Sequence, residues 1–598
     1  MGSARSQAQR GPKGGTGHGP RAPEALREAE LPVRNGRGSA RVDRAQLQGA
    51  RQDEVLDAPG GRGGTGAGGD RSLPRRPGTP GGGGQRRPGR AGGTAGPPEE
   101  DGLRTEPGSV FASSAAQVDK IYAFLGGEEA AGLEHSQLEG YIRTEGFELL
   151  RLLLQEHFDL RALREERLEE VADAKGAAYG AVERGHERPL TTVVGTVTVG
   201  RLAYRHRGEE NLYPADAISN LPEELYSHGL RELAAIEASR GSFEEAKEAV
   251  GRATGMVVGH RQVEDLAKAS AVDFEAFYEK EPRPEAEDGE VVVISADGKG
   301  VAMRPEGLRP ATAEAAKKAE QKLKTRLSPG EKANRKRMAE VAAVYTVKPV
   351  ARTAAEVMAS HDEGPKKAPE AEDKWLTASV AGEAAEVIAK AFSEADRRDP
   401  GHARPWVALV DGNNHQIDRI KAEAKKRRVK VTIVVDLVHV LGYLWDAAWC
   451  FFAQGDRAAE EWVAEKALAV LQGKAGLVAG AIKRKATNLG LEPKDRKNAD
   501  TCARYLHAKA RYLDYPKALA NGWPVATGVI EGAVRYLVKD RMSLTGARWS
   551  TEGAEAVLKL RALRKNRDWD RYFSFHLAQE RKRVHESRYL DNVIPAAA

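Results

Sequence analysis

Short apolar segments that each precede an acidic residue and a glycine occur in the middle of the chain. Residues 290–296 read EVVVISA before Asp297 and Gly298, and residues 406–410 read WVALV before Asp411 and Gly412. Two further apolar segments lie at 341–347 and 429–435, and a helical pattern separates the last two of the four. Near-continuous Val, Ile and Leu runs are typical of strands covered on both faces. Their alternation with helices predicts an α/β fold.

Composition divides the 598 residues unevenly, and a chain of this length predicts roughly three folded units. Residues 1–100 hold 25 of the 63 Gly and 11 of the 29 Pro, and no Phe, Trp or Tyr. Such a segment has too little to bury, so we expect a disordered tail over 1–105. The tail carries a charge of +7 within a total of +6, which leaves the rest near −1. The basic isoelectric point is therefore no evidence that the folded part binds nucleic acid.

The segments on either side of the strands are mainly helical. Residues 106–280 contain a small β element at 191–204 and a pair of short helices at 242–269. The second of these helices starts with His260, Arg261 and Gln262. A capping box from Ser242 to Glu245 and a glycine-containing turn favour a helix-turn-helix. An ordinary helical hairpin in a three-helix bundle gives the same pattern.

The sequence patterns also divide the rest of the chain into a linker, a core, an insertion and a tail. An acidic, proline-containing linker ends before residue 290, the first part of the core covers 290–436, and a helical insertion covers 437–520. The core ends over 521–575, and we expect a C-terminal tail at 576–598.

Several classes of protein are excluded by the polar residues and the cysteines. Cys450 and Cys502 are too few for a disulfide scaffold or a multi-cysteine zinc site, and both fit small buried side chains. The apolar segment 431–453 contains Asp436, His439 and Asp446, so it does not predict a membrane span. We expect no membrane partner and a cytoplasmic location in a reducing compartment.

A third acidic residue completes a candidate metal site. Glu531 lies at the expected start of a helix within GVIEGAVRYLVKDR. Carboxylates at strand ends point into the crevice where α/β proteins place their sites. Asp297, Asp411 and Glu531 could together hold two Mg²⁺ ions, with Mn²⁺ as a substitute, for phosphoryl displacement. Alone, each acid has an ordinary explanation, because Asp-Gly forms turns and a glutamate complements a helix dipole.

The motifs around these three acids resemble a known family. VVVISADGKGVAM, VALVDGNNHQ and VATGVIEGAVRYLVKDRMSLTGARWS are similar to bacterial insertion-sequence transposases of the ISKra type, which are distantly related to Mutator-like transposases. The resemblance covers about residues 107–575. It implies an RNase H-like catalytic core with an Asp–Asp–Glu triad, here Asp297, Asp411 and Glu531, and an all-helical insertion before the glutamate. The overall expectation is this α/β core, preceded by a mainly helical region with a small β element and a disordered tail.

The same resemblance assigns the sequence VVDLVHVLGYLWDAA to an element near the catalytic site. Its Asp436 and His439 are three residues apart, so both side chains can share one face at a helix start. The resemblance places His439 near substrate DNA or the triad. By chemistry alone, His439 equally fits a buried, hydrogen-bonded histidine, and Asp436 fits the N-cap of the helix that follows.

Basic segments provide candidate DNA contacts. Residues 317–337 hold nine Lys and Arg against two acids, and residues 421–430 hold six against one. Both could contact phosphates, although a solvated helix face has the same composition. The other candidates are the three residues that start the helix of the predicted helix-turn-helix and five residues after Glu531, namely Arg535, Lys539, Arg541, Arg548 and Trp549. Trp549 could stack on a displaced base or belong to the core.

The resemblance implies a DNA transposase that cleaves transposon ends and transfers the strands into target DNA. Its partner would be double-stranded DNA, both terminal repeats and target, and synapsis of two ends implies at least a homodimer. The expected location is the bacterial cytoplasm, at the nucleoid. Two alternatives remain, an RNase H-like nuclease without strand transfer and an inactive, co-opted DNA-binding protein. The unmatched segment 1–105 fits an extension from a mistaken start site.

Overall fold

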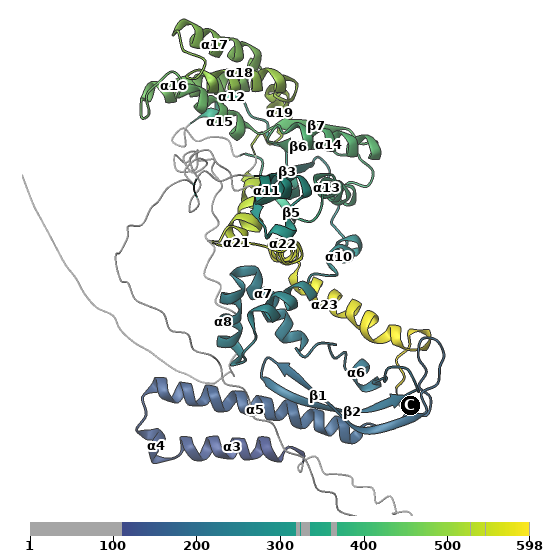
Figure 1. The fold of residues 1–598 in the computed structure, drawn as a ribbon. Coiled ribbons are helices and arrows are strands. Elements are labelled where there is room, and N and C mark those ends of the chain that lie inside the picture. The colour runs from purple at the N-terminus through teal and green to yellow at the C-terminus, as the bar shows by residue number, and fades with distance from the viewer. Residues whose placement is uncertain are drawn as a thin grey trace, which may run out of the picture. The chain divides into compact units, whose positions relative to one another are not determined.

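The structure is a computed structural model that describes residues 110–318, 323, 335–359, 368–526, 528–544 and 546–596 (Figure 1). The predicted tail at 1–105 and most of the basic segment 317–337 lie outside these residues. Within them, no helix is both long enough and apolar enough to cross a membrane.

A mixed five-stranded sheet forms the centre of an α/β fold. Its strands are β3 (Val291–Ala302), β4 (Lys336–Val347), β5 (Ala371–Ser379), β6 (Trp406–Val410) and β7 (Val431–Val435), in the order β5-β4-β3-β6-β7. β3 pairs antiparallel with β4, and β4 pairs antiparallel with β5. β3 and β7 flank β6 in parallel register. The four apolar segments supply four strands, and β5 is a fifth that the sequence analysis missed.

The strand β3 differs from its predicted extent. Asp297 was expected to end the strand, but β3 continues to Ala302. Its partner β4 is equally long and pairs with it along the whole length, from Val291 with Val347 to Ala302 with Lys336. Only the parallel pairing with β6 stops at Ala296. Asp297 therefore lies at the end of the parallel half of the sheet rather than at the end of a strand.

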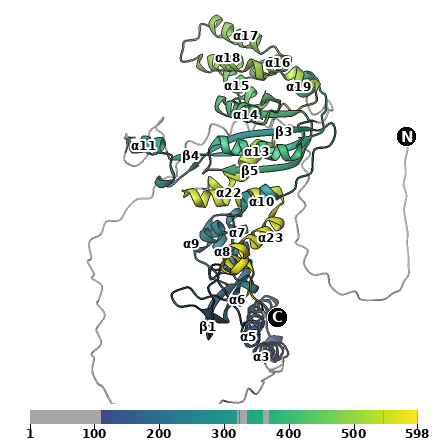
Figure 2. The ribbon, with the colours of Figure 1, turned by 90° about the vertical axis from the view of Figure 1, so that its right-hand side faces the viewer.

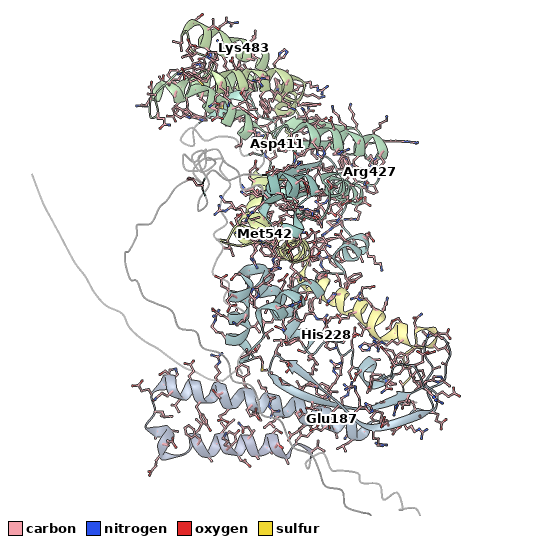
Figure 3. All side chains as sticks on the ribbon, in the orientation of Figure 1. Glu187, His228, Asp411, Arg427, Lys483 and Met542 are labelled. Carbon is pink, nitrogen blue, oxygen red and sulfur yellow. The ribbon has the colours of Figure 1, made fainter. Side chains whose placement is uncertain are left out.

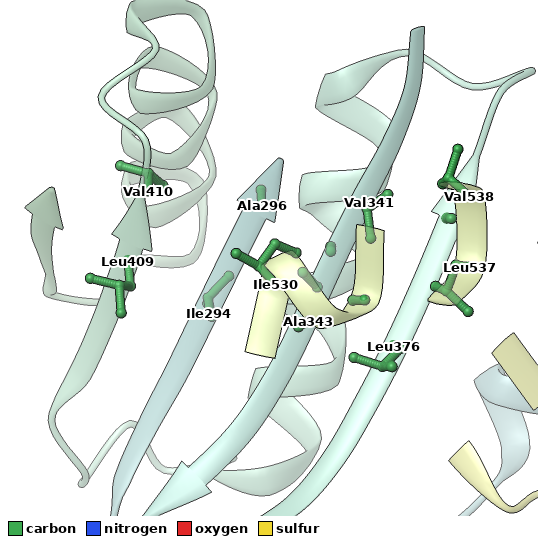
Figure 4. Packing of buried hydrophobic residues seen from close by; sticks show 14 of the residues in the cluster. Ile294, Ala296, Val341, Ala343, Leu376, Leu409, Val410, Ile530, Leu537 and Val538 are labelled. Atoms are coloured by element: carbon green, nitrogen blue, oxygen red, sulfur yellow. The ribbon is translucent and has the colours of Figure 1, made fainter. Parts of the chain in front are cut away.

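Helices cover the two faces of the sheet. On one face, Phe392 of α13 (Ala384–Arg398) packs against Trp406. On the other face, α20 (Gly528–Ala533) lies across β3 and β4 with Ile530 against the sheet, beside Val341 and Ala343 (Figure 4). α22 (Thr551–Asn566) packs beside β5 (Figure 2). The apolar segments of β3, β4 and β6 are buried on both faces, which explains their continuous apolar sequences.

Further helices belong to the core and to the predicted insertion. The core adds α11 (Pro310–Lys318), α12 (Ala354–Met358) and α14 (Asn414–Arg427). The described segment between β7 and α20 contains the helices α15 (Leu437–Ala448), α16 (Arg457–Leu471), α17 (Ala475–Asn488), α18 (Lys497–Lys509) and α19 (Tyr515–Ala520). α15 packs against α16 and α18, and α17 packs against α18.

The N-terminal region combines helices with one long hairpin. The hairpin is β1 (Ala181–Thr192) with β2 (Gly195–Arg205), longer than the element predicted at 191–204. The helices are α3 (Ala112–Leu125), α4 (Glu128–Ala131), α5 (His135–Arg164), α6 (Pro214–Ile218), α7 (His228–Arg240), α8 (Phe243–Thr254), α9 (His260–Ala269) and α10 (Phe274–Lys280). The capping box of Ser242 and Glu245 starts α8, and Gly255 in the left-handed conformation ends it. α7, α8 and α9 pack together, an arrangement that fits a helix-turn-helix or a plain three-helix bundle.

The C-terminal segment is structured rather than a tail. A π-helical turn (Val534–Lys539) and α21 (Asp540–Met542) follow α20, and α23 (Trp569–Glu580) follows α22. A second π-helical turn (Arg581–His585) continues α23, and Tyr589 beyond it is buried and bridges to Asp173. The prediction of a tail at 576–598 is therefore wrong as far as residue 596. Tyr589 and His585 bury against the N-terminal region, where His585 contacts the Leu221 carbonyl.

Candidate active site

Three aspartates lie in a row at one edge of the sheet. Ala296, Val410 and Val435 are paired across β3, β6 and β7, and they form the last row of the parallel register. The next residue of each strand is an aspartate: Asp297, Asp411 and Asp436. The Asp436 amide still donates to the Val410 carbonyl at 2.8 Å, which continues the register by one step. The carboxyl edge of three neighbouring parallel strands thus presents three carboxylates, at the edge where α/β sheets place their sites.

The backbone around Asp411 is held by the insertion. The Asp411 Oδ1 accepts a hydrogen bond from the Asn413 amide at 2.7 Å, and the Asp411 carbonyl accepts one from the Tyr505 hydroxyl at 2.8 Å. Tyr505 lies on α18 and stacks on Tyr443 of α15, with ring centroids 4.0 Å apart. The helical insertion therefore positions the start of α14 and the Asp411 turn. Asp411 itself is labelled in Figure 3.

Gly412 makes this contact possible, and Gly412→Ala is expected to disturb it. The residue has a φ of +89°, and a Cβ atom would lie 2.7 Å from the Tyr505 hydroxyl. The left-handed backbone alone costs a side chain about 1–3 kcal/mol, and the contact displaces Tyr505. We expect a lower melting temperature and reduced activity, measured by thermal unfolding and by DNA joining.

The matched control is Gly442→Ala in α15, where nothing lies within 4 Å of the new Cβ. It should leave stability unchanged or slightly raised, because alanine favours a helix. Equal melting temperatures for the Gly412 variant and the wild type would show that the close approach to Tyr505 has no consequence.

Asp436, His439 and Glu531 come together at the end of the row. Asp436 is buried and is the N-cap of α15, since its Oδ1 accepts from the Val438 amide at 2.6 Å. One ligand atom from each of the three residues lies within 4.8 Å of the others. His439 stands in the first turn of α15, and Glu531 stands in the first turn of α20. The structure thus brings Glu531 to the Asp436–His439 pair, whereas Asp297 and Asp411 extend the row from Asp436.

Burial and the charges of neighbouring residues shift the pKa of Asp297. Burial raises the pKa of Asp297, the charge of Asp411 raises it further, and the Gly298 amide at 2.6 Å and His439 lower it. The charge of Lys299 also lowers the pKa of Asp297, but among the residues that the structure describes neither Asp297 nor Asp411 has a Lys or Arg nitrogen within 4.0 Å. Two carboxylates that repel each other at an edge of this kind are stabilised by a bound cation.

Glu340 is a further acidic residue that the sequence analysis missed. It lies on β4 opposite Gly298, and a Cβ on Gly298 would be 3.3 Å from its carboxylate. Burial raises its pKa, and the charges of Asp297 and Asp411 add to that effect. The local sequence MAEVAAVYTV gives no sign of this proximity, because the strand pairing alone brings Glu340 beside the row.

The donor atoms suit a divalent metal ion. Asp297, Asp411, Asp436 and Glu531 offer carboxylate oxygens, the ligands that Mg²⁺ and Mn²⁺ prefer. His439 adds a nitrogen donor, and its Nδ1 is buried with no hydrogen-bond partner in the part of the chain that the structure describes. The set therefore fits the predicted metal, and Asp436 and His439 add donor atoms to those of the predicted triad.

Two of the predicted DNA contacts belong to the core instead. Arg541 is 2% exposed and Trp549 is 4% exposed. The Arg541 guanidinium lies against the rings of Trp549 and Phe243, which contact each other, and its Nε donates to the Ala238 carbonyl at 3.1 Å. Both residues therefore join α7 and α8 to the end of the core and are closed to DNA. Their assignment as DNA-binding residues was wrong.

The other predicted contacts are at the surface. Arg535, Lys539 and Arg548 are exposed, as are His260, Arg261 and Gln262 at the start of α9. In the basic segment 421–430, Arg427 is tied to Asp396 at 2.7 Å, while Lys425, Lys426, Arg428 and Lys430 are exposed. These side chains are accessible to a phosphate backbone.

Comparison with known proteins adds no relative. Neither a scan against protein-family models nor a search of curated proteins gives a match for this chain.

Proposed function

We propose that this protein is a DNA transposase with an RNase H-like catalytic core, which cleaves transposon ends and transfers them into target DNA. The observation that carries the proposal is the row of Asp297, Asp411 and Asp436, which Glu531 and His439 complete at one end. The sequence resemblance to ISKra-type transposases supports the same reading. The mixed sheet and the helices inserted before Glu531 are compatible with the core that the resemblance implies.

In this proposal, Asp297, Asp411 and Glu531 would hold two Mg²⁺ ions. Asp436 neighbours Asp411 in the row and also lies close to Glu531. Two such ions would activate an attacking hydroxyl and stabilise the leaving oxygen of an in-line displacement. The protein orients the carboxylates: the Asn413 amide fixes Asp411, the Gly298 amide fixes Asp297, and α20 carries Glu531 to the edge of the sheet. His439 lies beside the row, and its buried Nδ1, which has no hydrogen-bond partner among the described residues, would be a further donor to a metal ion.

The proposed partner is double-stranded DNA. The exposed start of α9, with Arg261 and Gln262, could read base edges of the terminal repeats in a major groove. Lys425, Lys426, Arg428 and Lys430 could contact the phosphate backbone. Joining two ends requires at least a dimer on DNA. The bacterial nucleoid is the place where this activity would occur.

The test is a joining assay with a duplex that carries the DNA bordering the gene on each side. We expect Mg²⁺-dependent cleavage at a border and joining of a pre-cleaved border to plasmid DNA. Cleavage without joining would support the alternative of an RNase H-like nuclease. Binding of the border DNA without any metal-dependent cleavage would support an inactive DNA-binding protein, and either result would overturn the proposal.

A further inference from the structure

The helix that carries Glu531 continues into an exposed aromatic residue. Tyr536 stands in the π-helical turn that follows α20 and is 45% exposed. A Cβ on Gly532 would lie 3.5 Å from its ring, so the ring leans back towards the residue that follows Glu531. Tyr536 follows Glu531 by five residues and leaves much of its ring open to a ligand.

The backbone of Tyr536 is held by an arginine from another helix. Arg561 of α22 donates through Nε to the carbonyls of Tyr536 and Leu537, at 2.8 Å and 3.1 Å. It also donates to the Ser239 carbonyl at the end of α7. A π-helical turn changes the pattern of backbone hydrogen bonds, and such turns are frequent at functional sites. Arg561 therefore acts as a positioning residue that fixes Tyr536 relative to Glu531.

One cation lies against the Tyr536 ring, and a second stands in the same turn. The Lys565 ammonium lies 4.5 Å from the ring centroid, and the exposed Arg535 pairs at the surface with Asp540 at 3.7 Å. Burial lowers the pKa of Lys565, and the nearby charges of Arg561 and Arg564 lower it further. The charge of Asp540 partly offsets this repulsion, and a bound anion such as phosphate would relieve the rest.

From this geometry we propose that Tyr536 stacks on an unpaired DNA base beside the bond that is cut, while Lys565 and Arg535 bind the adjacent phosphates. The assignment of DNA as the partner rests on the proposed function. Aromatic side chains beside cations are the usual means by which proteins hold single-stranded nucleic acid. The role that the sequence analysis gave to Trp549 is thereby assigned to Tyr536, because Trp549 is buried and Tyr536 is exposed.

The test is binding of a fluorescein-labelled single-stranded oligothymidylate, followed by anisotropy without divalent metal. Tyr536→Ala should bind about tenfold more weakly, within the range known for loss of one stacked base. Tyr536→Phe should bind like the wild type, because it keeps the ring. Lys565→Gln should weaken binding and flatten its dependence on salt. Tyr122→Ala on α3 removes a tyrosine that is 70% exposed and is the matched control.

A second readout separates stacking from loss of structure. An oligonucleotide with one 2-aminopurine should lose fluorescence on binding to the wild type and to Tyr536→Phe, but not to Tyr536→Ala. Unchanged binding and quenching in Tyr536→Ala would overturn the inference, as would a wild type that binds no single strand. The assay needs no cleavage, so Tyr536-dependent binding in a protein that joins no DNA would instead contradict the proposed function.

Discussion

Asp297→Asn, Asp411→Asn and Glu531→Gln are each expected to abolish Mg²⁺-dependent joining of a pre-cleaved DNA end. Each change keeps the shape of the side chain and removes one charged ligand. Metal stabilisation of a phosphoryl-transfer transition state contributes several kcal/mol, so the rate should fall roughly a thousandfold or more. Binding of the border DNA should remain largely intact, since these changes leave the exposed basic residues that are proposed to contact DNA in place. The measurement is a joining time course beside a gel-shift titration.

Asp436→Asn separates the role of Asp436 as a helix cap from its proposed role in the metal site. Asparagine caps a helix as well as aspartate does, so the hydrogen bond to Val438 and the melting temperature should be kept. If Asp436 also belongs to the metal site, joining should still fall. Asp418→Asn, an exposed acid on α14, is the control and should behave as the wild type. Joining at the wild-type rate by any of the three predicted triad variants would remove that residue from the site.

Arg231→Met is expected to lower the free energy of unfolding by about 3–5 kcal/mol, because it leaves a buried charge without its partner. Arg231 of α7 is 1% exposed, and its Nη2 donates to Glu580 of α23 at 2.8 Å and to Glu224 at 2.7 Å. Arg231 therefore links the N-terminal helices to the C-terminal helix. Urea unfolding followed by circular dichroism measures the effect, and Arg231→Met with Glu580→Met should recover part of it.

The control for Arg231 lies on the same helix. Arg240 is 56% exposed and pairs with Glu237 at the surface, so Arg240→Met should cost less than about 1 kcal/mol. Equal losses from the two variants would contradict the proposed importance of the buried network.

The same network gives the stability of the protein a pH dependence. Burial by itself raises the pKa of Glu580, but its hydrogen bonds and charge pairing with Arg231 lower it overall. The pKa of Asp273 is likewise lowered, since His576 and Arg583 outweigh burial. The stabilisation from a lowered carboxyl pKa is present above the unfolded value, near 4, and is lost as pH falls through the folded value. The wild type should therefore lose more stability below about pH 4 than Arg231→Met does.

The sequence predicts those parts of the fold in which periodicity and burial agree. The four apolar segments became strands because both faces of the sheet are covered. β5 was missed because three of its first four residues, AEDK, are charged and only its second half is buried. The far end of β3 was missed because GKGVA gives no strand pattern, and only the pairing with β4 extends it.

The spacing of residues in the sequence predicted only part of the candidate site. Asp297 and Asp411 were identified from their positions after apolar strands, but the row that includes Asp436 depends on strand register. Arg541 was placed at the surface by assuming a 3.6-residue period after Glu531. The π-helical turn Val534–Lys539 changes that period, so Arg541 points into the core instead. The C-terminal segment was predicted to be a tail, but its buried charges pair with residues of the N-terminal helices, which the sequence alone does not reveal.

The most direct test of metal-dependent chemistry at the aspartate row is the metal preference of Asp411→Cys in the joining assay. A thiolate binds Mg²⁺ poorly and binds softer ions such as Mn²⁺ better. We predict that Asp411→Cys is inactive with Mg²⁺ and regains joining with Mn²⁺, while Asp418→Cys is active with both. Joining by Asp411→Cys at the wild-type rate in Mg²⁺ would contradict a metal-binding role for Asp411 and, with it, the proposed site.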